Sequence, residues 1–531
     1  MGFNRRQFLQ AVGVGISGVP LIAAGSTTGT TLEVAATPIG STGYRRLQAG
    51  PGWPLVVRTD LANALPKRET TRTALAAFVQ FSDMHICDAQ SPMRFEYVHP
   101  YIGSGAHRPH ETLTNQASTA LVRKVNQLKQ GPFTGRGFDF LMTTGDNTDN
   151  HETVELEWFL KVLNGGTITP NTGDPARFEG VQNASLAQYW QPETTAKDDY
   201  KAKGFPYVPD LLHKAIQPFT SPGLNIPWYS TIGNHDDSVV GSLPDGLLDS
   251  LYTGRHKIVG FGTTTETAKV AQALHDPKYV PEAIGLITTK GVVRTVTPDA
   301  RRAPFSTSQF VRAHLQNTGP GPVGHGYTSD NADGKDVFYT FRIAPGVTGI
   351  SLDTTNLAGF ADGSIGWYQY RWLEDQLRRT SDFVIVFSHH TSRSMGNVLP
   401  DRRRPLDPRL TGDALVRLLQ KYPKVIAWVN GHTHRNEITP HGTFWEINTA
   451  AHVDYPQHAR IIEVVDNGDG TLSLFTTLIE PDAPYQASYD DFSERGLASL
   501  AREFQYNDVH LNSARLGQPQ DRNTELLLTV R

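Results

Sequence analysis

The chain has 531 residues, of which 38% are hydrophobic, so it is long enough to bury a large core. Its 49 Lys and Arg against 53 Asp and Glu give a formal net charge of −4, which excludes a strongly basic footprint for nucleic acid or anionic membranes. Because there is one cysteine, Cys87, an internal disulfide is excluded and the fold must rest on packing or bound metal.

The first residues have the pattern of an export signal. Residues 4–9 read NRRQFL, a twin-arginine pattern, and a weakly apolar stretch rich in Gly and Ala continues to Ala24. That stretch is too short for a confident membrane span, and small residues at 34–36 offer a cleavage site. We therefore predict a signal peptide over 1–36 that the twin-arginine export machinery recognises. The alternative is a basic patch before an ordinary buried helix.

The remainder of the chain alternates between strand and helix patterns. Residues 37–74 are rich in Thr, Gly and Pro and are predicted to form an N-terminal arm or linker. Apolar periodicity then predicts strands at 75–81, 138–142, 226–232, 347–352, 383–387 and 425–429, and helices at 110–130, 154–163, 368–379 and 415–420. A hairpin is expected over 461–479, around the turn NGDG. The alternation predicts a sheet layered with helices.

Two long segments interrupt this rhythm, at about 164–225 and about 238–346. Both contain prolines and aromatic residues, including Tyr189, Trp190 and Phe310, which is too aromatic for simple disorder. We predict that they are ordered inserts beside the functional site. Peripheral decoration of the fold is the alternative.

Five short polar blocks each follow a largely apolar run. They read DMH at 83–85, GDNTD at 145–149, GNHD at 233–236, HH at 389–390 and GHTH at 431–434. Oxygen and nitrogen ligands of these types hold pairs of metal ions, which clamp a phosphoryl group for in-line attack. Asp83 and His85 are two residues apart, so in an extended turn both side chains point the same way and reach one ion.

Together the blocks resemble the motif set of the calcineurin-like metallophosphoesterase superfamily. With its N-terminus, the chain is similar to a twin-arginine-exported branch that carries long inserts between the motifs. The resemblance extends over 75–480, implying a metallophosphoesterase domain there and a C-terminal extension over 481–531. It implies an α/β (α+β layered) fold in which two facing mixed β-sheets are flanked by helices and hold a dinuclear metal site at their strand ends.

The resemblance also implies the metal ligands. The sulfur-free set of nitrogen and oxygen ligands fits Mn, Zn or Fe, as divalent or trivalent ions. Asp146 is expected to bridge the two ions with its two oxygens. The first ion would be held by Asp83, His85, Asp146 and His434, and the second by Asp146, Asn234, His389 and His432.

The resemblance assigns two catalytic residues. His235 would contact the phosphate and protonate the leaving group, a role that suits an imidazole near neutral pH. Asp149 would hydrogen-bond His235 and fix its tautomer. The alternative role for Asp149 is to cap the helix that begins near Val154. The purple acid phosphatase branch places a metal-binding tyrosine at position 149, so a tyrosinate–iron site is not expected here.

Three further residues are candidates for binding substrate. His390 follows His389 and is the alternative ligand, but the first histidine after the strand usually serves in this superfamily, so His390 would line the pocket. Arg393 and Arg435 follow ligand blocks and could contact a phosphate. Ordinary surface arginines are the alternative.

These features predict an exported dinuclear-metal phosphoesterase. It would hydrolyse small phosphate mono- or diesters through a metal-bridging hydroxide, in the periplasm, the cell envelope or outside the cell. The mature protein is expected to be soluble, without a membrane span, and not to bind nucleic acid. The alternatives are a nuclease on the same scaffold, which the near-neutral charge disfavours, and a non-catalytic envelope binding protein, which the complete ligand set disfavours.

Overall fold

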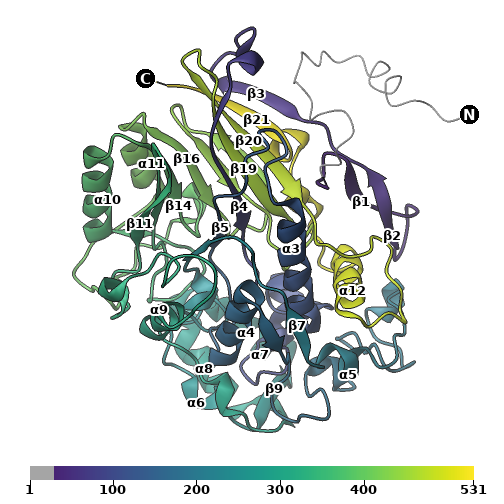
Figure 1. Cartoon of the computed structure of the whole chain (residues 1–531). Coiled ribbons are helices and arrows are strands. Elements are labelled where there is room, and N and C mark those ends of the chain that lie inside the picture. The colour runs from purple at the N-terminus through teal and green to yellow at the C-terminus, as the bar shows by residue number, and fades with distance from the viewer. Residues whose placement is uncertain (1–28, 531) are drawn as a thin grey trace, which may run out of the picture.

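Two mixed β-sheets form the centre of the computed structural model, which describes residues 29–530 (Figure 1). In the first sheet β4, β5 and β8 are parallel to one another, and β19 and β20 continue it in antiparallel fashion. Its strand order is β3 (Val56–Leu61), β21 (Thr524–Thr529), β20 (Thr471–Ile479), β19 (Ala459–Asp466), β4 (Thr73–Phe81), β5 (Phe140–Thr144) and β8 (Trp228–Thr231).

The second sheet has six strands. Four of them, β12, β14, β16 and β18, are parallel, and an antiparallel strand closes each edge. Its order is β11 (Tyr339–Ala344), β12 (Val347–Ser351), β14 (Phe383–Phe387), β16 (Val425–Asn430), β18 (Trp445–Asn448) and β17 (Glu437–Pro440).

Side-chain alternation along β4 separates two hydrophobic layers. Phe78 faces the second sheet, where its ring centroid lies 5.7 Å from that of Phe387. Val79 faces the other way and packs with helices on the outer side. Figure 1 shows helices outside both sheets, so the layers run helix, sheet, sheet, helix. The outer helices are α3 (Thr114–Leu128) and α4 (Thr153–Asn164) on the first sheet, and α10 (Trp367–Arg379) and α11 (Gly412–Gln420) on the second.

The predicted fold class is confirmed, since two facing mixed sheets are flanked by helices. The predicted strands and helices between β4 and β20 occur within a few residues of their expected bounds. No helix among residues 29–530 is both long and apolar enough to cross a membrane.

The two ends of the described chain add strands to the first sheet, whereas the sequence predicted only an N-terminal arm and a C-terminal extension. Within the predicted linker, β3 adds a strand to the first sheet, and within 481–531, β21 lies between β3 and β20 while α12 (Glu494–Tyr506) packs on α3. β3 and β21 pair with each other from opposite ends of the chain, and local sequence pattern does not show such a pairing. A hairpin of β1 (Val34–Pro38) and β2 (Leu47–Pro51) precedes them.

The predicted signal peptide lies mostly outside the described residues, which start at 29. Its predicted cleavage site at 34–36, however, falls within β1. Ala35 is buried, and the Ala36 N–H donates to the Glu480 carboxylate at 3.0 Å. Thr31 Oγ1 also donates to the Leu478 carbonyl at 2.9 Å. Cleavage before Thr30 would preserve these contacts, whereas cleavage at 34–36 would remove them.

Both predicted inserts are ordered, but the second is shorter than expected because β11, within 238–346, belongs to the second sheet. The elements of the inserts gather together at the lower part of Figure 1. The first contains β6 (Gly166–Ile168), α5 (Leu211–Ala215) and β7 (Phe219–Ser221); the second contains α6 (Asp249–Tyr252), β9 (His256–Phe261), α7 (Thr264–Ala273), α8 (Val280–Thr289), β10 (Gly291–Thr295) and α9 (Thr307–Leu315). The remaining short elements are α2 (His99–Ile102), β13 (Ile365–Gly366) and β15 (Arg409–Leu410).

Candidate metal centre

The ligand blocks lie where parallel strands end. Asp83, Asp146 and His389 each come two residues after the last residue of β4, β5 and β14, respectively. His432 comes two residues after the end of β16, and Asn234 comes three residues after the end of β8. Because parallel strands direct their carboxyl ends to one edge of a sheet, the five loops meet there.

The backbone of these loops is not extended. Positive φ angles in non-glycine residues are uncommon and unfavourable, and they cluster at functional sites. The expected reason for Asp83 and His85 to share an ion, alternation in an extended turn, is therefore wrong, although the two side chains do converge. Five ligand residues have left-handed backbone: Asp83 (φ 51°), His85 (42°), Asp146 (51°), His432 (70°) and His434 (54°).

The first cluster is the set predicted for the first ion. Asp83, His85, Asp146 and His434 each offer a ligand atom within 4.8 Å of the others. His85 Nε2 lies 3.6 Å from Asp146 Oδ2, is buried and has no hydrogen-bond partner. His434 Nε2 lies 3.3 Å from Asp83 Oδ1. An unpartnered buried nitrogen among carboxylates fits a cation, because it would satisfy all of these atoms together.

The second cluster shares Asp146 with the first. His389 Nε2 lies 3.0 Å from Asn234 Oδ1 and 3.2 Å from Asp146 Oδ2. His432 Nδ1 lies 3.2 Å from the same His389 nitrogen. Of the Asp146 oxygens, Oδ2 faces ligands of both clusters, whereas Oδ1 accepts the His235 backbone N–H at 2.8 Å. Asp146 Oδ2 is thus the atom that the two clusters share.

His389 and His390 have different surroundings. His389 Nδ1 is paired with the Thr144 carbonyl at 2.8 Å, which directs Nε2 into the centre. Both ring nitrogens of His390 are engaged, Nδ1 with Thr354 Oγ1 at 2.8 Å and Nε2 with the Ala361 carbonyl at 2.9 Å. This geometry favours His389 as the ligand and leaves no ring nitrogen of His390 for substrate.

The carboxylates favour positive charge at the centre. Burial lowers the pKa of His389, but nearby Asp146 outweighs burial and raises it to about 9. Burial likewise opposes the protonation of His434, yet Asp83 raises its pKa above the ordinary value. A metal ion would supply this charge directly.

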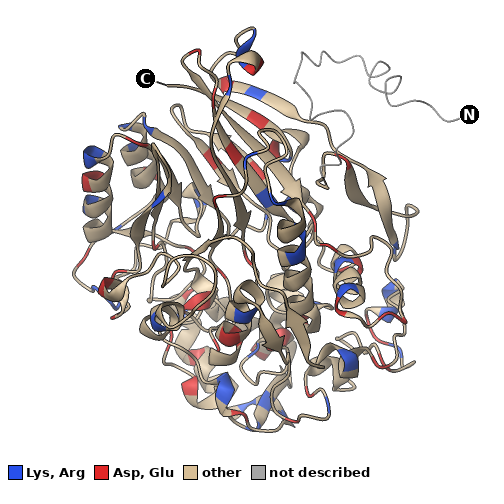
Figure 2. Cartoon of the chain, viewed as in Figure 1, with Lys and Arg blue, Asp and Glu red and all other residues tan. Residues whose placement is uncertain are grey.

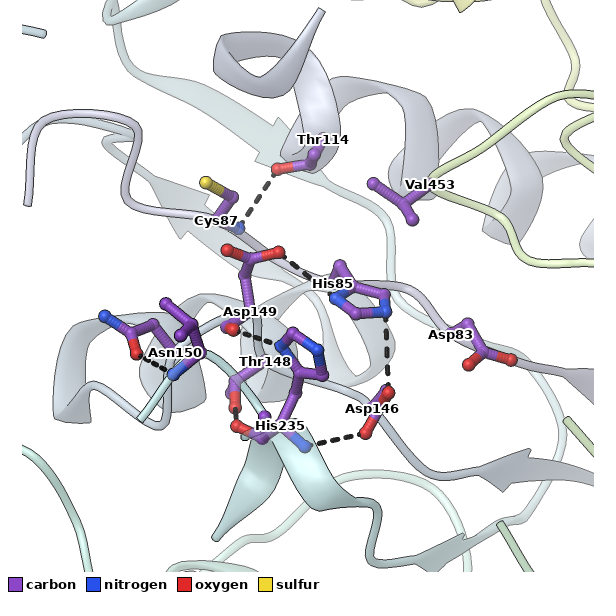
Figure 3. A network of polar contacts seen from close by, with 12 residues as sticks. Asp83, His85, Cys87, Thr114, Asp146, Thr148, Asp149, Asn150, His235 and Val453 are labelled. Carbon is purple, nitrogen blue, oxygen red and sulfur yellow. Dashed lines mark hydrogen bonds and ion pairs between the residues drawn. The ribbon is translucent and has the colours of Figure 1, made fainter. Parts of the chain in front are cut away.

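The Asp149 carboxylate does not contact the His235 ring, contrary to expectation. Figure 3 shows it against His85, where Oδ1 lies 3.1 Å from His85 Nδ1. It is instead the Asp149 backbone carbonyl that pairs with His235 Nδ1. Arg94 and Arg108 are the reason, because the carboxylate turns toward their guanidinium groups. Asp149 does not cap α4 either, since Glu152 and Glu155 form the capping box.

Sequence reasoning missed the buried ionic network behind the first cluster. Asp454 Oδ2 lies 2.6 Å from His434 Nδ1, and Asp454 Oδ1 accepts from Arg108 Nε at 2.9 Å. Arg94 donates to both Asp149 and Glu111. Carboxylates on the Nδ1 atoms of His85 and His434 direct both Nε2 atoms toward the cluster. Asp454 comes six residues after the end of β18, and no motif in the sequence marks it.

Of the two arginines that were candidates for contacting a phosphate, Arg393 does not lie over the centre. Arg393 is 72% exposed and its guanidinium pairs with Glu437 at 2.9 Å, so it lies along the surface rather than over the centre. Arg435 is exposed beside His434.

Comparisons with known proteins give one family and several structural likenesses. The calcineurin-like phosphoesterase family model matches residues 76–436. A dimetal phosphatase from Danio rerio is similar over 77% of this chain and 100% of its own, at 10% identity and a TM-score of 0.35. A purple acid phosphatase from yellow lupin (Lupinus luteus) seeds is similar over 82% of this chain and 54% of its own, at 10% identity and a TM-score of 0.28. No curated protein sequence matches.

Proposed function

Because the chain belongs to the calcineurin-like phosphoesterase family, we propose that it hydrolyses small phosphate mono- or diesters at the centre described above. One observation carries this proposal: the seven predicted ligands come from five separate loops and converge around a single Asp146 oxygen. Two bound ions would stabilise the charge on a phosphoryl group under in-line attack and would activate water for that attack.

His235 is placed to move a proton. Its ring is partly exposed, and its centroid lies 4.5 Å from the His85 ring. Because the Asp149 carbonyl can only accept a hydrogen bond, it keeps a proton on His235 Nδ1. Nε2 is then the atom that gains and loses a proton, and we propose that it protonates the leaving oxygen. Asp149 thus acts on His235 through its backbone and on His85 through its carboxylate.

The proposal is tested with a substrate panel on protein loaded with Mn, Zn or Fe. Nitrophenyl phosphate, bis-nitrophenyl phosphate and single-stranded DNA separate monoesterase, diesterase and nuclease activity. The account expects hydrolysis of one of the small esters and little activity on DNA. Figure 2 shows Lys and Arg interspersed with Asp and Glu along the described chain, which gives little support for a cationic track. Hydrolysis of none of the three at any metal would contradict the proposal.

We also propose export by the twin-arginine route, on the strength of residues 4–9 and the small-residue stretch after them. Replacing Arg5 and Arg6 together by Lys keeps the charge but removes the pair that this route reads. The double variant should accumulate in the cytoplasm, and fractionation with immunodetection measures this. The control replaces Lys124 and Lys129 by Arg. Unchanged extracytoplasmic recovery of the Arg5→Lys, Arg6→Lys variant would mean that the N-terminus has another role.

A further inference from the structure

The start of the second insert lies against Asn234 and His235, in the loop that follows β8. The Asn234 side-chain amide donates from Nδ2 to the Gly241 backbone carbonyl at 2.9 Å. With Nδ2 held there, Oδ1 is directed into the centre, 3.0 Å from His389 Nε2. Only the oxygen of an amide can bind a cation, so the opposite orientation would remove Asn234 from the ligand set. On the basis of the proposed function, we propose that Gly241 is the positioning residue for both Asn234 and His235.

The absence of a side chain at Gly241 leaves room for the His235 ring. A Cβ there would overlap His235 Cδ2 and Nε2 and would lie 2.7 Å from Asn234 Nδ2. His235 has little freedom to withdraw, because its Nδ1 is held by the Asp149 carbonyl and its backbone N–H by Asp146 Oδ1. Gly241 also has a φ of 64°, which favours glycine. Position 241 therefore favours glycine for two reasons: its φ is positive, and a side chain there would collide with His235 and Asn234.

The loop that carries Gly241 is fixed from the insert side. Val239 and Leu243 exchange two backbone hydrogen bonds, at 2.9 and 3.0 Å, and both are buried in the hydrophobic cluster of the insert. The Val240 N–H donates to Asn150 Oδ1 at 2.7 Å, and the Tyr252 hydroxyl donates to the same oxygen at 3.1 Å. Val240 has a φ of 44°, which is unfavourable for a β-branched residue and persists only where neighbours hold it. Residues of the insert and Asn150 thereby hold the backbone on both sides of Gly241.

This arrangement makes the effect of Gly241 selective. It contacts Asn234, a ligand of the second ion, and His235, the proton donor. Asp83, His85 and His434 of the first cluster are held by other elements, namely the loops after β4 and β16 and the Asp149 and Asp454 carboxylates. Disturbing Gly241 should therefore weaken the second ion and proton transfer while leaving the first ion in place.

The test compares Gly241→Ala with Gly246→Ala. Gly246 has a similar backbone, with φ 85°, but a Cβ there would meet no heavy atom within 4 Å. Both variants therefore place alanine at a positive φ, but only the alanine at position 241 would collide with neighbouring side chains. After metal-replete expression and desalting, elemental analysis should find about one ion per chain in Gly241→Ala and about two in Gly246→Ala and the parent chain. Thermal unfolding of each variant records whether it is folded.

The kinetic readout is the dependence on leaving group. For Gly241→Ala, kcat should fall about 10²-fold or more on alkyl phosphates and less on nitrophenyl phosphate, which needs less protonation. A Gly241→Ala protein with two ions and the kinetics of Gly246→Ala would overturn the proposal. If Gly241→Ala does not fold, Asn150→Ala releases Val240 without adding an atom; partial loss of the second ion supports the proposal, and full retention overturns it. A parent chain with no ions and no hydrolysis would refute the proposed function instead.

Discussion

Asp146→Asn should abolish binding of both ions and, with it, hydrolysis. Asp146 Oδ2 lies 3.2 Å from His389 Nε2 and 3.6 Å from His85 Nε2, so a single oxygen serves both clusters. Burial raises the pKa of this carboxyl, but His389 and His235 outweigh burial and hold the pKa well below its usual range, so Asp146 is anionic. Asparagine keeps the shape but removes this charge. The loss of metal affinity should exceed the roughly 10–100-fold loss that typically follows mutation of a residue that hydrogen-bonds a metal ligand.

Elemental analysis and turnover measure this effect together. Asp236→Asn is the matched control, because Asp236 is a buried carboxylate in the adjacent loop that accepts backbone N–H groups from Gly233 and Thr148. Burial raises the pKa of Asp236 to about 6, and its two oxygens are occupied by these backbone groups. The control should retain metal. An Asp146→Asn protein that keeps both ions would show that Asp146 does not bridge.

His235→Ala should separate chemistry from metal binding. His235 is in neither cluster around Asp146 Oδ2, and its hydrogen bond to Asp146 comes from its backbone N–H, which alanine retains. Metal content should therefore stay nearly intact, while kcat falls roughly 10²–10⁴-fold, the usual range for losing a general acid. The loss should be smaller for nitrophenyl esters than for alkyl esters, because nitrophenolate leaves without protonation.

Asp149→Asn distinguishes this account from the one expected from sequence. Its backbone carbonyl, which pairs with His235, is unchanged by the substitution, whereas its carboxylate supports His85. The variant should therefore lose affinity for the first ion and show no special dependence on the leaving group. A leaving-group effect like that of His235→Ala, with metal binding intact, would instead restore the predicted Asp149–His235 pair.

Local pattern in the sequence was sufficient to identify side chains that converge in the structure, and their role as ligands stays a prediction. Each is in a short polar block directly after an apolar strand, and the carboxyl ends of parallel strands meet, so position in sequence translates into position in space. The resemblance favours His389 over His390 as the ligand, and the hydrogen bonds of the two rings favour the same residue. What sequence could not give was the backbone of these loops, whose left-handed residues carry no glycine signature.

The surroundings of the ligands depend on long-range packing. Arg94 and Arg108 come from a loop without a motif, yet they decide which way the Asp149 carboxylate turns. Asp454 and Gly241 lie outside the polar blocks, at 20 residues from His434 and 7 from Asn234, and no motif marks either of them. The terminal strands β3 and β21 escaped prediction for a related reason, since their pairing depends on residues at the opposite end of the chain.

The most direct test of the central claim is the metal content of the purified chain after expression with Mn, Zn or Fe. Seven ligands from five loops around one shared carboxylate oxygen predict close to two ions per chain. A second purification of Asp146→Asn in parallel should yield close to none. Absence of bound metal in the parent chain after metal-replete expression would contradict the dinuclear centre and the hydrolytic function that rests on it.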